Sequence, residues 1–210
     1  NTMQPNSETS PAPLFIETLK IADGRFVDSA PHRERIKNTL AETSIRLPNL
    51  PAFRDEDIPA DLRRGIVKCR CTYGDALCHI EYERYVPRPV PSLKLVENNH
   101  IDYHFKYADR TPLLQLLELR GACDDVLIVR HGEITDTSYS NILLFDGTRY
   151  VTPRASLLNG TKRRRLLEEG RIEEAAIRPS DLPRFQTLHL INAMLDIEDN
   201  ISLPVSRILL

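Results

Sequence analysis

The sequence predicts an α+β protein with two domains that meet near residue 97. Strand-like runs of apolar and β-branched residues recur along the chain, often joined by Asp-Gly or Gly-Asp turns, whereas few segments show helical spacing. With 210 residues, 41% of them hydrophobic, the chain can form one large core or two smaller ones. We expect a smaller N-terminal α+β domain at residues 14–97 and a larger C-terminal domain at residues 98–210.

The start of the chain, residues 1–13, is polar and rich in proline. Such a composition does not bury enough apolar surface to offset the entropy lost on folding. We expect residues 1–13 to be a disordered leader or a remnant left by cloning.

Local patterns define the elements of the N-terminal domain. The stretch FIETLKIADGRFVD predicts two strands joined by an Asp-Gly turn. In APHRERIKNTLAETSI, Ile36, Leu40 and Ile45 stand at helical spacing among charged residues. Two further strands flank a Gly-Asp turn, and KLVENN predicts a short strand that ends this domain.

The C-terminal domain begins with a predicted helix over residues 112–119, which Gly121 ends. DVLIVRHG is typical of a buried strand, and NILLF-DG-TRYV predicts a hairpin. A second helix follows Gly160 and closes at Gly170. RIEEAAI, TLHLINAM and ISLPVSRIL predict the last strands.

The stretch ITDTSYSN, which precedes the predicted hairpin, is unusual for a strand. It carries an acid, Asp136, then small hydroxyl residues, and it ends at Asn141. Strands favour β-branched and aromatic residues and avoid Asp and Asn. We infer that this stretch needs an acid and short hydrogen-bonding groups more than it needs strand propensity, although an isolated acid near a turn is usually a capping group.

Charge and cysteine usage exclude several classes of protein. The net charge of −2 argues against a general nucleic-acid or membrane-surface binder, and no apolar run is long enough to span a membrane. Cys69 and Cys71 face the same way on a strand, but no second ligand pair completes a zinc site, so we predict no metal. We expect the four cysteines to be reduced thiols that pack as small hydrophobes, in a cytoplasmic protein.

One pattern suggests an anion site. Gly160 and Thr161 precede a helix whose first turn holds Lys162, and free N–H groups at a helix start bind phosphate. Cations there oppose the helix dipole unless an anion is present. The alternative is a solvated basic face over residues 162–165, and the overall charge balance argues against nucleic-acid binding through it, so we predict no nucleic-acid partner.

Single residues add candidates for chemistry. Lys106 lies between two aromatic residues, where desolvation would lower its pKa and make it a usable nucleophile or base. The alternative is a lysine whose stem packs at a strand edge while its amine stays in water. Arg35, on the predicted helix, does not by itself indicate a functional site.

Taken in order, the motifs FIETLKIADGRF, HRERI, FKYADR, ITDTSYSNILLF, YVTP and LLNGTKRR are more specific than any one of them. This series resembles the class IV aminotransferase family, the pyridoxal-phosphate enzymes of fold type IV. The resemblance extends from Phe15 to the C-terminus. It implies a small N-terminal α+β domain, a larger C-terminal domain with a barrel-like sheet, and pyridoxal 5′-phosphate bound between them.

The resemblance also implies roles for individual residues. Lys106 matches the lysine that holds the cofactor as a Schiff base and shuttles the proton. Asp136 stands where the family has a glutamate that pairs with the pyridine nitrogen, and keeps the ring an electron sink. The residues implied for the phosphate end or for structural support of the cofactor are Arg35, Asn141, Gly160, Thr161, Lys162 and Asn192.

Three features depart from the family pattern. Asp136 is one methylene shorter than glutamate, and GTKR replaces a GITR-like sequence, which shifts the register of the phosphate contacts by one residue. The usual YGDGVFET-like turn is reduced to LFIET. We therefore keep open a catalytically degenerate protein that binds a phosphate ligand or a partner.

The resemblance implies an enzyme that acts on a primary amine next to an acidic group. FKYADR is similar to the lysine-containing motif of aminodeoxychorismate lyase, which releases pyruvate and p-aminobenzoate for folate biosynthesis. The alternative is a transaminase of branched-chain or D-amino acids. The family is normally homodimeric, so we expect a homodimer. Four residues are candidates for substrate contacts: His32, His104, Arg110 and Arg154.

Overall fold

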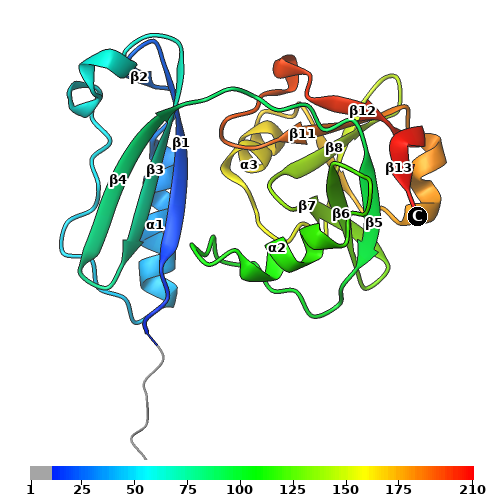
Figure 1. Ribbon diagram of the computed structural model, residues 1–210, viewed down its shortest axis with the longest axis horizontal. Coiled ribbons are helices and arrows are strands. Elements are labelled where there is room, and N and C mark those ends of the chain that lie inside the picture. Colours follow the sequence, from blue (N-terminus) through cyan, green and yellow to red (C-terminus); the bar gives the residue numbers. More distant parts are fainter. Residues whose placement is uncertain (1–10) are drawn as a thin grey trace, which may run out of the picture.

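The computed structural model describes residues 11–210 and contains two domains joined by an extended linker (Figure 1). Most of the predicted leader therefore lies outside the described residues; residues 11–13 are exposed and have no regular structure. The linker follows the first sheet at residue 85 and reaches the second domain at residue 92.

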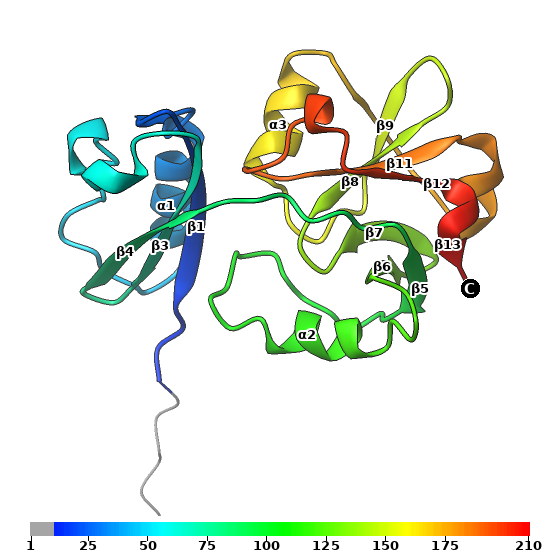
Figure 2. The ribbon, with the colours of Figure 1, turned by 45° about the horizontal axis from the view of Figure 1, so that its top comes forward.

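The N-terminal domain is an antiparallel sheet covered on one face by a helix (Figures 1 and 2). The strand order is β2-β1-β3-β4. The strands are β1 (Phe15–Ala22), β2 (Arg25–Phe26), β3 (Ile66–Gly74) and β4 (Leu77–Arg84), and the helix is α1 (Ala30–Glu42). Short 3-10 turns, η1 (Asp55–Asp57) and η2 (Ala60–Leu62), lie in the loop between α1 and β3. The predicted hairpins and helix are confirmed.

Alternation along β1 divides its side chains between two environments. Phe15, Leu19 and Ile21 belong to the core of the domain and are almost fully buried. Side chains of a strand alternate between the faces of a sheet, so Ile16, Thr18 and Lys20 face the second domain. Lys20, for example, forms an ion pair with Asp196 of that domain.

The C-terminal domain contains two sheets and two helices. The first sheet has the order β13-β5-β6-β7 and the second the order β10-β9-β8-β11-β12. The helices are α2 (Thr111–Glu118) and α3 (Thr161–Glu168). The strands are β5 (Leu93–Glu97), β6 (Asp125–Arg130), β7 (Glu133–Thr137), β8 (Asn141–Phe145), β9 (Tyr150–Pro153), β10 (Glu173–Ala175), β11 (Thr187–Ile191), β12 (Ser202–Pro204) and β13 (Ile208–Leu209). The 3-10 turns are η3 (Pro179–Arg184), η4 (Ile197–Asp199) and η5 (Val205–Arg207).

One apolar core joins the two sheets of the C-terminal domain. Leu127 and Ile134 of the first sheet pack in the same cluster as Ile142, Leu144 and Leu188 of the second. Shared burial of both inner faces gives the barrel-like arrangement that the resemblance implied.

Two expectations from the sequence need correction. Leu93–Glu97 does not end the N-terminal domain, because β5 pairs in parallel with β6 along its whole length. Asp136 does not begin a strand of the hairpin. It lies near the end of β7, a separate strand that pairs with β6, and residues 138–140 form the turn to β8.

A loop of the C-terminal domain returns to the first sheet and fixes Lys106 at the junction of the domains. The N–H of Ile16 donates to the carbonyl of Lys106 at 2.9 Å, and the N–H of Ala108 donates to that of Leu14 at 2.8 Å. Phe15 stacks on Tyr107 with ring centroids 5.5 Å apart. The backbone of Lys106 is therefore held by β1, although it belongs to the second domain by sequence.

The cysteines are free, and three of them pack as expected. Cys69, Cys71 and Cys123 are buried, whereas Cys78 is exposed with its Sγ 3.7 Å from that of Cys71. Burial raises the pKa of Cys69 to about 12. Among residues 11–210, no group of three His, Cys, Asp or Glu side chains has a metal-binding arrangement. No helix in that part of the chain has the length and apolar character needed to cross a membrane.

Because the two sheets share one core, truncating a side chain in it should cause a large loss of stability. Leu144→Ala should lower the free energy of unfolding by about 2–5 kcal/mol, because Leu144 is completely buried between the two sheets. Leu119→Ala, at a leucine that is 57% exposed, should change it by no more than about 0.5 kcal/mol. Urea denaturation measures both, and equal losses would show that the core is not where we place it.

Candidate active site

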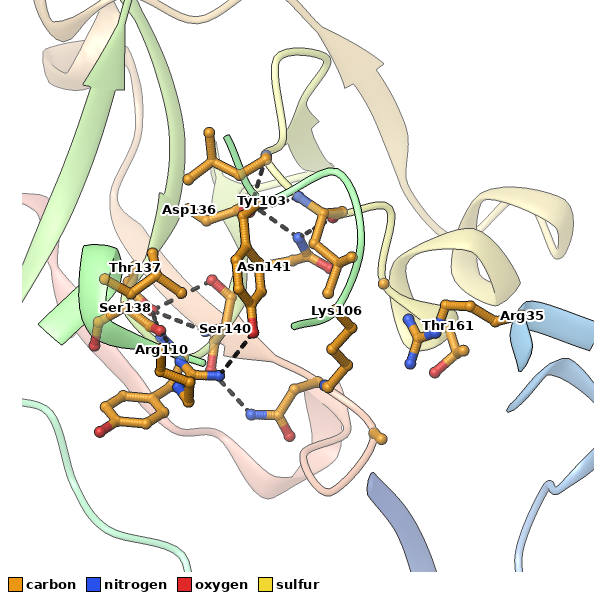
Figure 3. A pocket seen from close by; sticks show the side chains of 17 residues that line it. Arg35, Tyr103, Lys106, Arg110, Asp136, Thr137, Ser138, Ser140, Asn141 and Thr161 are labelled. Carbon is orange, nitrogen blue, oxygen red and sulfur yellow. Dashed lines mark hydrogen bonds between the residues drawn. The ribbon is translucent and has the colours of Figure 1, made fainter. Parts of the chain in front are cut away.

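A cavity lies between the two domains and is lined by residues from both (Figure 3). Arg35 comes from α1, Asp136 from β7, Asn141 from β8 and Thr161 from the start of α3. Lys106 reaches it from the loop that docks on β1. The predicted residues that line the cavity are Arg35, Lys106, Arg110, Asp136, Asn141, Gly160, Thr161 and Asn192. The fold therefore brings most of the predicted site together.

Lys106 carries an amine suited to act as a nucleophile at neutral pH. Burial, together with the positive charge of Arg35, lowers its pKa from 10.5 to about 7, although Glu17 opposes this shift. About half of the amine is then neutral at pH 7, and only the neutral form attacks a carbonyl.

Asp136 is a buried carboxyl held in place by three donors. Asn141 Nδ2 donates to Oδ1 at 3.0 Å, and the N–H groups of Leu157 and Leu158 donate to Oδ2 at 3.0 and 3.2 Å. Burial raises its pKa to about 6, although these hydrogen bonds pull it down. A cation or protonated nitrogen placed beside it would favour the ionised form.

The hydroxyl residues after Asp136 form the turn that connects β7 to β8. Thr137 Oγ1 accepts the N–H of Ser140 at 3.1 Å. Ser138 Oγ donates to Asp125 Oδ1 at 2.6 Å. These short side chains form hydrogen bonds with the buried polar groups of the turn, which explains why the stretch has low strand propensity.

Gly160 and Asn141 are in close contact at the start of α3. Asn141 Nδ2 bridges Asp136 Oδ1 and the carbonyl of Leu158, at 3.0 and 2.9 Å. A Cβ at position 160 would lie only 2.2 Å from Asn141 Oδ1. A glycine is therefore required here to let the helix start approach the asparagine.

The end of the cavity near α1 and α3 has the features of an anion site. Gly160 caps α3 without a side-chain hydrogen bond, so the first N–H groups of α3 have no partner within the helix. Thr161 lies at this end beside Arg35 (Figure 3), whereas Asn192, which also lines the cavity, donates through Nδ2 to Ser140 Oγ at 2.9 Å. Arg35 Nη1 is buried and has no hydrogen-bond partner among the described residues. An anion here would satisfy donors that are otherwise unpaired.

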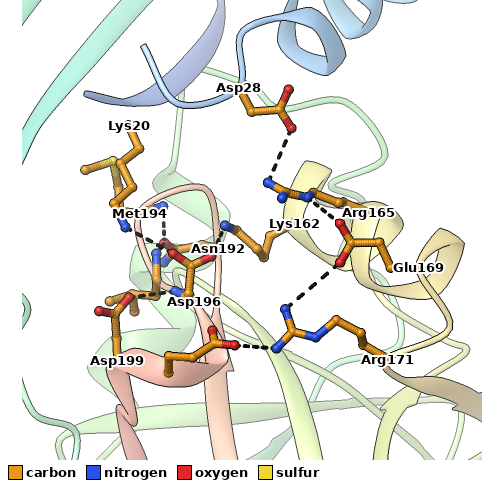
Figure 4. A network of polar contacts seen from close by, with 12 residues as sticks. Lys20, Asp28, Lys162, Arg165, Glu169, Arg171, Asn192, Met194, Asp196 and Asp199 are labelled. Carbon is orange, nitrogen blue, oxygen red and sulfur yellow. Dashed lines mark hydrogen bonds and ion pairs between the residues drawn. The ribbon is translucent and has the colours of Figure 1, made fainter. Parts of the chain in front are cut away.

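The side chain of Lys162 turns away from this cavity, contrary to the expectation that it completes the phosphate contacts (Figure 4). It forms an ion pair with Asp196, which also binds Lys20 of β1 at 3.1 Å. Arg165, one turn further along α3, approaches Asp28 of the N-terminal domain at 3.7 Å. These pairs tie α3 to the first domain, so Lys162 contributes to the helix start only through its backbone.

Three of the four predicted substrate contacts lie elsewhere in this chain. His104 is 69% exposed and faces Glu42 at 3.4 Å. Arg154 is 60% exposed and pairs with Glu133 at 2.9 Å. His32 is buried, with its Nδ1 2.7 Å from Glu17 Oε2. Each of these three side chains pairs with a nearby acid, and the sequence pattern does not predict these pairings.

Arg110 does line the cavity, and aromatic rings hold it. Its guanidinium lies 4.5 Å from the ring centroid of Tyr139 and 5.8 Å from that of Tyr103. It also donates to the carbonyl of Ser138, and its buried Nε has no hydrogen-bond partner within residues 11–210. Arg110 also borders a wider cleft of about 740 Å³ between the domains, together with Arg70, Arg88 and Arg120.

Sequence reasoning missed Glu17, which is fully buried and bonded to both His32 and Arg35. It also missed Tyr103 and Tyr139, which line the cavity and flank Arg110. One sign of Glu17 was available, because it occupies the buried register of β1, between Phe15 and Leu19. An acid in that register needs a partner.

Comparison with known proteins gives the family. The family model described as amino-transferase class IV matches residues 103–199. An uncharacterised protein from Haemophilus influenzae is 34% identical over 186 residues, which cover 87% of this chain and 97% of that protein. The chain belongs to the class IV aminotransferase family.

Solved structures agree with this family. A candidate 4-amino-4-deoxychorismate lyase from Haemophilus somnus is 29% identical, with a TM-score of 0.78, covering 89% of this chain and 98% of that one. A candidate amino-acid aminotransferase from Mesorhizobium loti shares the fold with a TM-score of 0.73. It is 24% identical, and the match covers 86% of this chain and 95% of that one. A hypothetical aminotransferase from Mycobacterium tuberculosis, solved with PLP bound, is 19% identical and shares the fold with a TM-score of 0.73, over 91% of this chain and 84% of that one. The predicted family and fold are confirmed.

The lowered pKa of Lys106 predicts an unusual pH profile of labelling. An amine-reactive acylating reagent should modify Lys106 with a rate that rises through a midpoint near pH 7, because only the neutral amine reacts. Mass spectrometry of the Lys106 peptide at successive pH values measures this rate. In denatured protein the midpoint should return toward 10.5, and a midpoint near that value in the native protein would contradict the burial argument.

The contact at Gly160 predicts a coupled pair of variants. Gly160→Ala should lower the free energy of unfolding by about 1–3 kcal/mol, because the new methyl group collides with the Asn141 side chain. In an Asn141→Ala background the same change should cost much less, since the colliding oxygen is gone. Denaturant unfolding of the four proteins gives the coupling, and strictly additive losses would place the strain elsewhere.

Proposed function

We propose that this protein is a pyridoxal-phosphate-dependent enzyme in which Lys106 holds the cofactor. The observation that carries the proposal is that a lysine of lowered pKa, a buried carboxyl and an unpaired arginine nitrogen line one cavity. These are the groups that the aldehyde, the pyridine nitrogen and the phosphate of this cofactor require.

The residues of the cavity fit the cofactor at each end. Arg35 Nη1, Thr161 and the helix start at Gly160 would bind the phosphate, since the arginine nitrogen is buried and has no partner in the described part of the chain. Asp136 would accept a hydrogen bond from the protonated ring nitrogen. Its carboxylate accepts three hydrogen bonds within the protein and has capacity for another. Asn141 would keep that carboxylate in place.

When bound, the cofactor supplies an electron sink for the bond being broken next to the substrate amine. Lys106, freed by the incoming substrate, would remove a proton as a general base through its neutral Nζ. The charge of Asp136 would keep the proton on the ring nitrogen. Arg110, fixed between Tyr103 and Tyr139, would bind an acidic group of the substrate.

Within this chemistry we favour an aminodeoxychorismate lyase-like reaction that releases pyruvate and p-aminobenzoate, in folate biosynthesis. The candidate lyase from Haemophilus somnus supports it, since it is similar over 98% of its length. The arginine-bordered cleft supports a substrate with carboxylates. We also propose that the protein acts as a homodimer, as is usual in the family.

A transaminase of branched-chain or D-amino acids is the alternative. The fold is shared with the branched-chain amino acid aminotransferase of Escherichia coli, which is 12% identical with a TM-score of 0.69. In a transaminase, the amino group would pass from the amino acid to the acceptor by way of the bound cofactor, and Lys106 would move the proton as a keto acid leaves.

Two incubations of the protein with added cofactor test the reaction. With aminodeoxychorismate alone, p-aminobenzoate should appear, and Lys106→Ala should reduce its rate by at least about 100-fold, because the variant lacks the base. Turnover only of an amino acid paired with a keto-acid acceptor would instead support the transaminase. No turnover in either assay, with cofactor bound, would favour a degenerate family member.

A further inference from the structure

Glu17 lies outside the cavity and bonds to Arg35, which lines it. Glu17 lies on β1 and is 0% exposed. A buried carboxylate is costly unless it is paired and hydrogen-bonded, so its partners identify its purpose. Its partners are Arg35 and His32, which lie three residues apart on α1 and therefore share a helix face.

Glu17 forms a bidentate ion pair with one side of the Arg35 guanidinium. Arg35 Nε donates to Oε1 and Nη2 donates to Oε2, both at 2.6 Å. Such a two-point contact fixes the plane of the guanidinium as well as its position. The remaining nitrogen, Nη1, is then directed away from Glu17; it is buried, unpaired among the described residues, and part of a side chain that lines the cavity.

His32 holds the carboxylate from a second direction. Its Nδ1 lies 2.7 Å from Glu17 Oε2, and both side chains are buried. Glu17 has a pKa of about 2, because Arg35 and His32 outweigh the effect of its burial. Burial lowers the pKa of His32, so at neutral pH the ring is uncharged and donates through Nδ1. The acid therefore stays ionised whenever the protein is folded near neutral pH.

We propose that Glu17 is a positioning residue for the phosphate: with His32, it orients Arg35 so that Nη1 points into the cavity to bind that group. The inference rests on the proposed function. Without the contact to Glu17, the Arg35 side chain would have many rotamers. Ordering it would then cost part of the free energy of phosphate binding, and the contact to Glu17 avoids this cost.

A purely electrostatic role for Glu17 predicts the opposite sign. Its negative charge lowers the attraction between Arg35 and a phosphate, so removing that charge alone would tighten phosphate binding. Positioning and charge can therefore be separated by two substitutions. Glu17→Asp keeps the charge but is too short to hold both Arg35 and His32, and Glu17→Gln keeps the shape but loses the charge-assisted contact.

The test compares the dissociation constants of pyridoxal phosphate and pyridoxal, measured by absorbance titration of each protein. Both Glu17→Asp and Glu17→Gln should weaken binding of the phosphorylated form by about 10- to 100-fold and leave pyridoxal nearly unchanged. Glu34→Gln, on the exposed side of the same helix, is the matched control and should change neither constant. Arg35→Lys should reproduce the loss, and adding Glu17→Asp to it should cost little more.

Other results would overturn the inference. The inference is wrong if Glu17→Asp binds pyridoxal phosphate as tightly as the wild type or more tightly. It is also wrong if the variant loses equal affinity for pyridoxal phosphate and pyridoxal, because a general folding defect has that effect. If the Glu17 variants do not fold, His32→Asn should still weaken the phosphorylated ligand selectively, and no selective loss would count against positioning. If the wild-type protein binds neither ligand, the proposed function fails, and protection against thermal unfolding by inorganic phosphate tests Glu17 separately.

Discussion

The docking of the loop around Lys106 on the edge of β1 is the interaction on which the site depends. Hydrogen bonds from Ile16 and Ala108, together with the stack of Phe15 on Tyr107, join the second domain to the first sheet. The same contacts bury Lys106 near Arg35, and this burial is the main cause of its lowered pKa. Without this docking, Lys106 and Arg35 would not line one cavity.

The cavity and Glu17, which lies behind it, combine buried charges whose environments push their pKa values in different directions. Lys106 is near 7, Asp136 near 6 and Glu17 near 2. Burial acts on all three, but only Glu17 has an arginine bonded to it. Asp136 has neutral donors, so its charge is left for a bound ligand to stabilise. Pairs of titratable groups with separated pKa values are typical of catalytic sites.

Much of the local structure follows from the sequence, because its causes are local. The Asp-Gly turn after β1, the helical spacing of α1 and the glycine before α3 define elements that the structure contains. Asp136 and Asn141 were found together because the stretch between them contradicts strand propensity. Such conflicts between propensity and position are where functional groups concentrate.

The remaining features depend on contacts between distant segments. The side chain of Lys162 turns toward Asp196, and Arg154 toward Glu133; no local pattern encodes these pairings. The rest of β1, β2 and the first turn of α1 separate Glu17 from Arg35 in the sequence, and the packing of α1 on β1 brings them together. The placement of β5 in the second domain follows from its parallel pairing with β6, which periodicity does not predict.

The central claim is that Lys106 holds pyridoxal phosphate at the junction of the domains. The measurement that tests it most directly is the visible spectrum of the purified protein with added cofactor, followed by borohydride reduction and mapping of the modified peptide. We predict a visible absorption band and a reduced adduct on Lys106. No band and no adduct on Lys106 would contradict the claim and leave a protein of this family that has lost its chemistry.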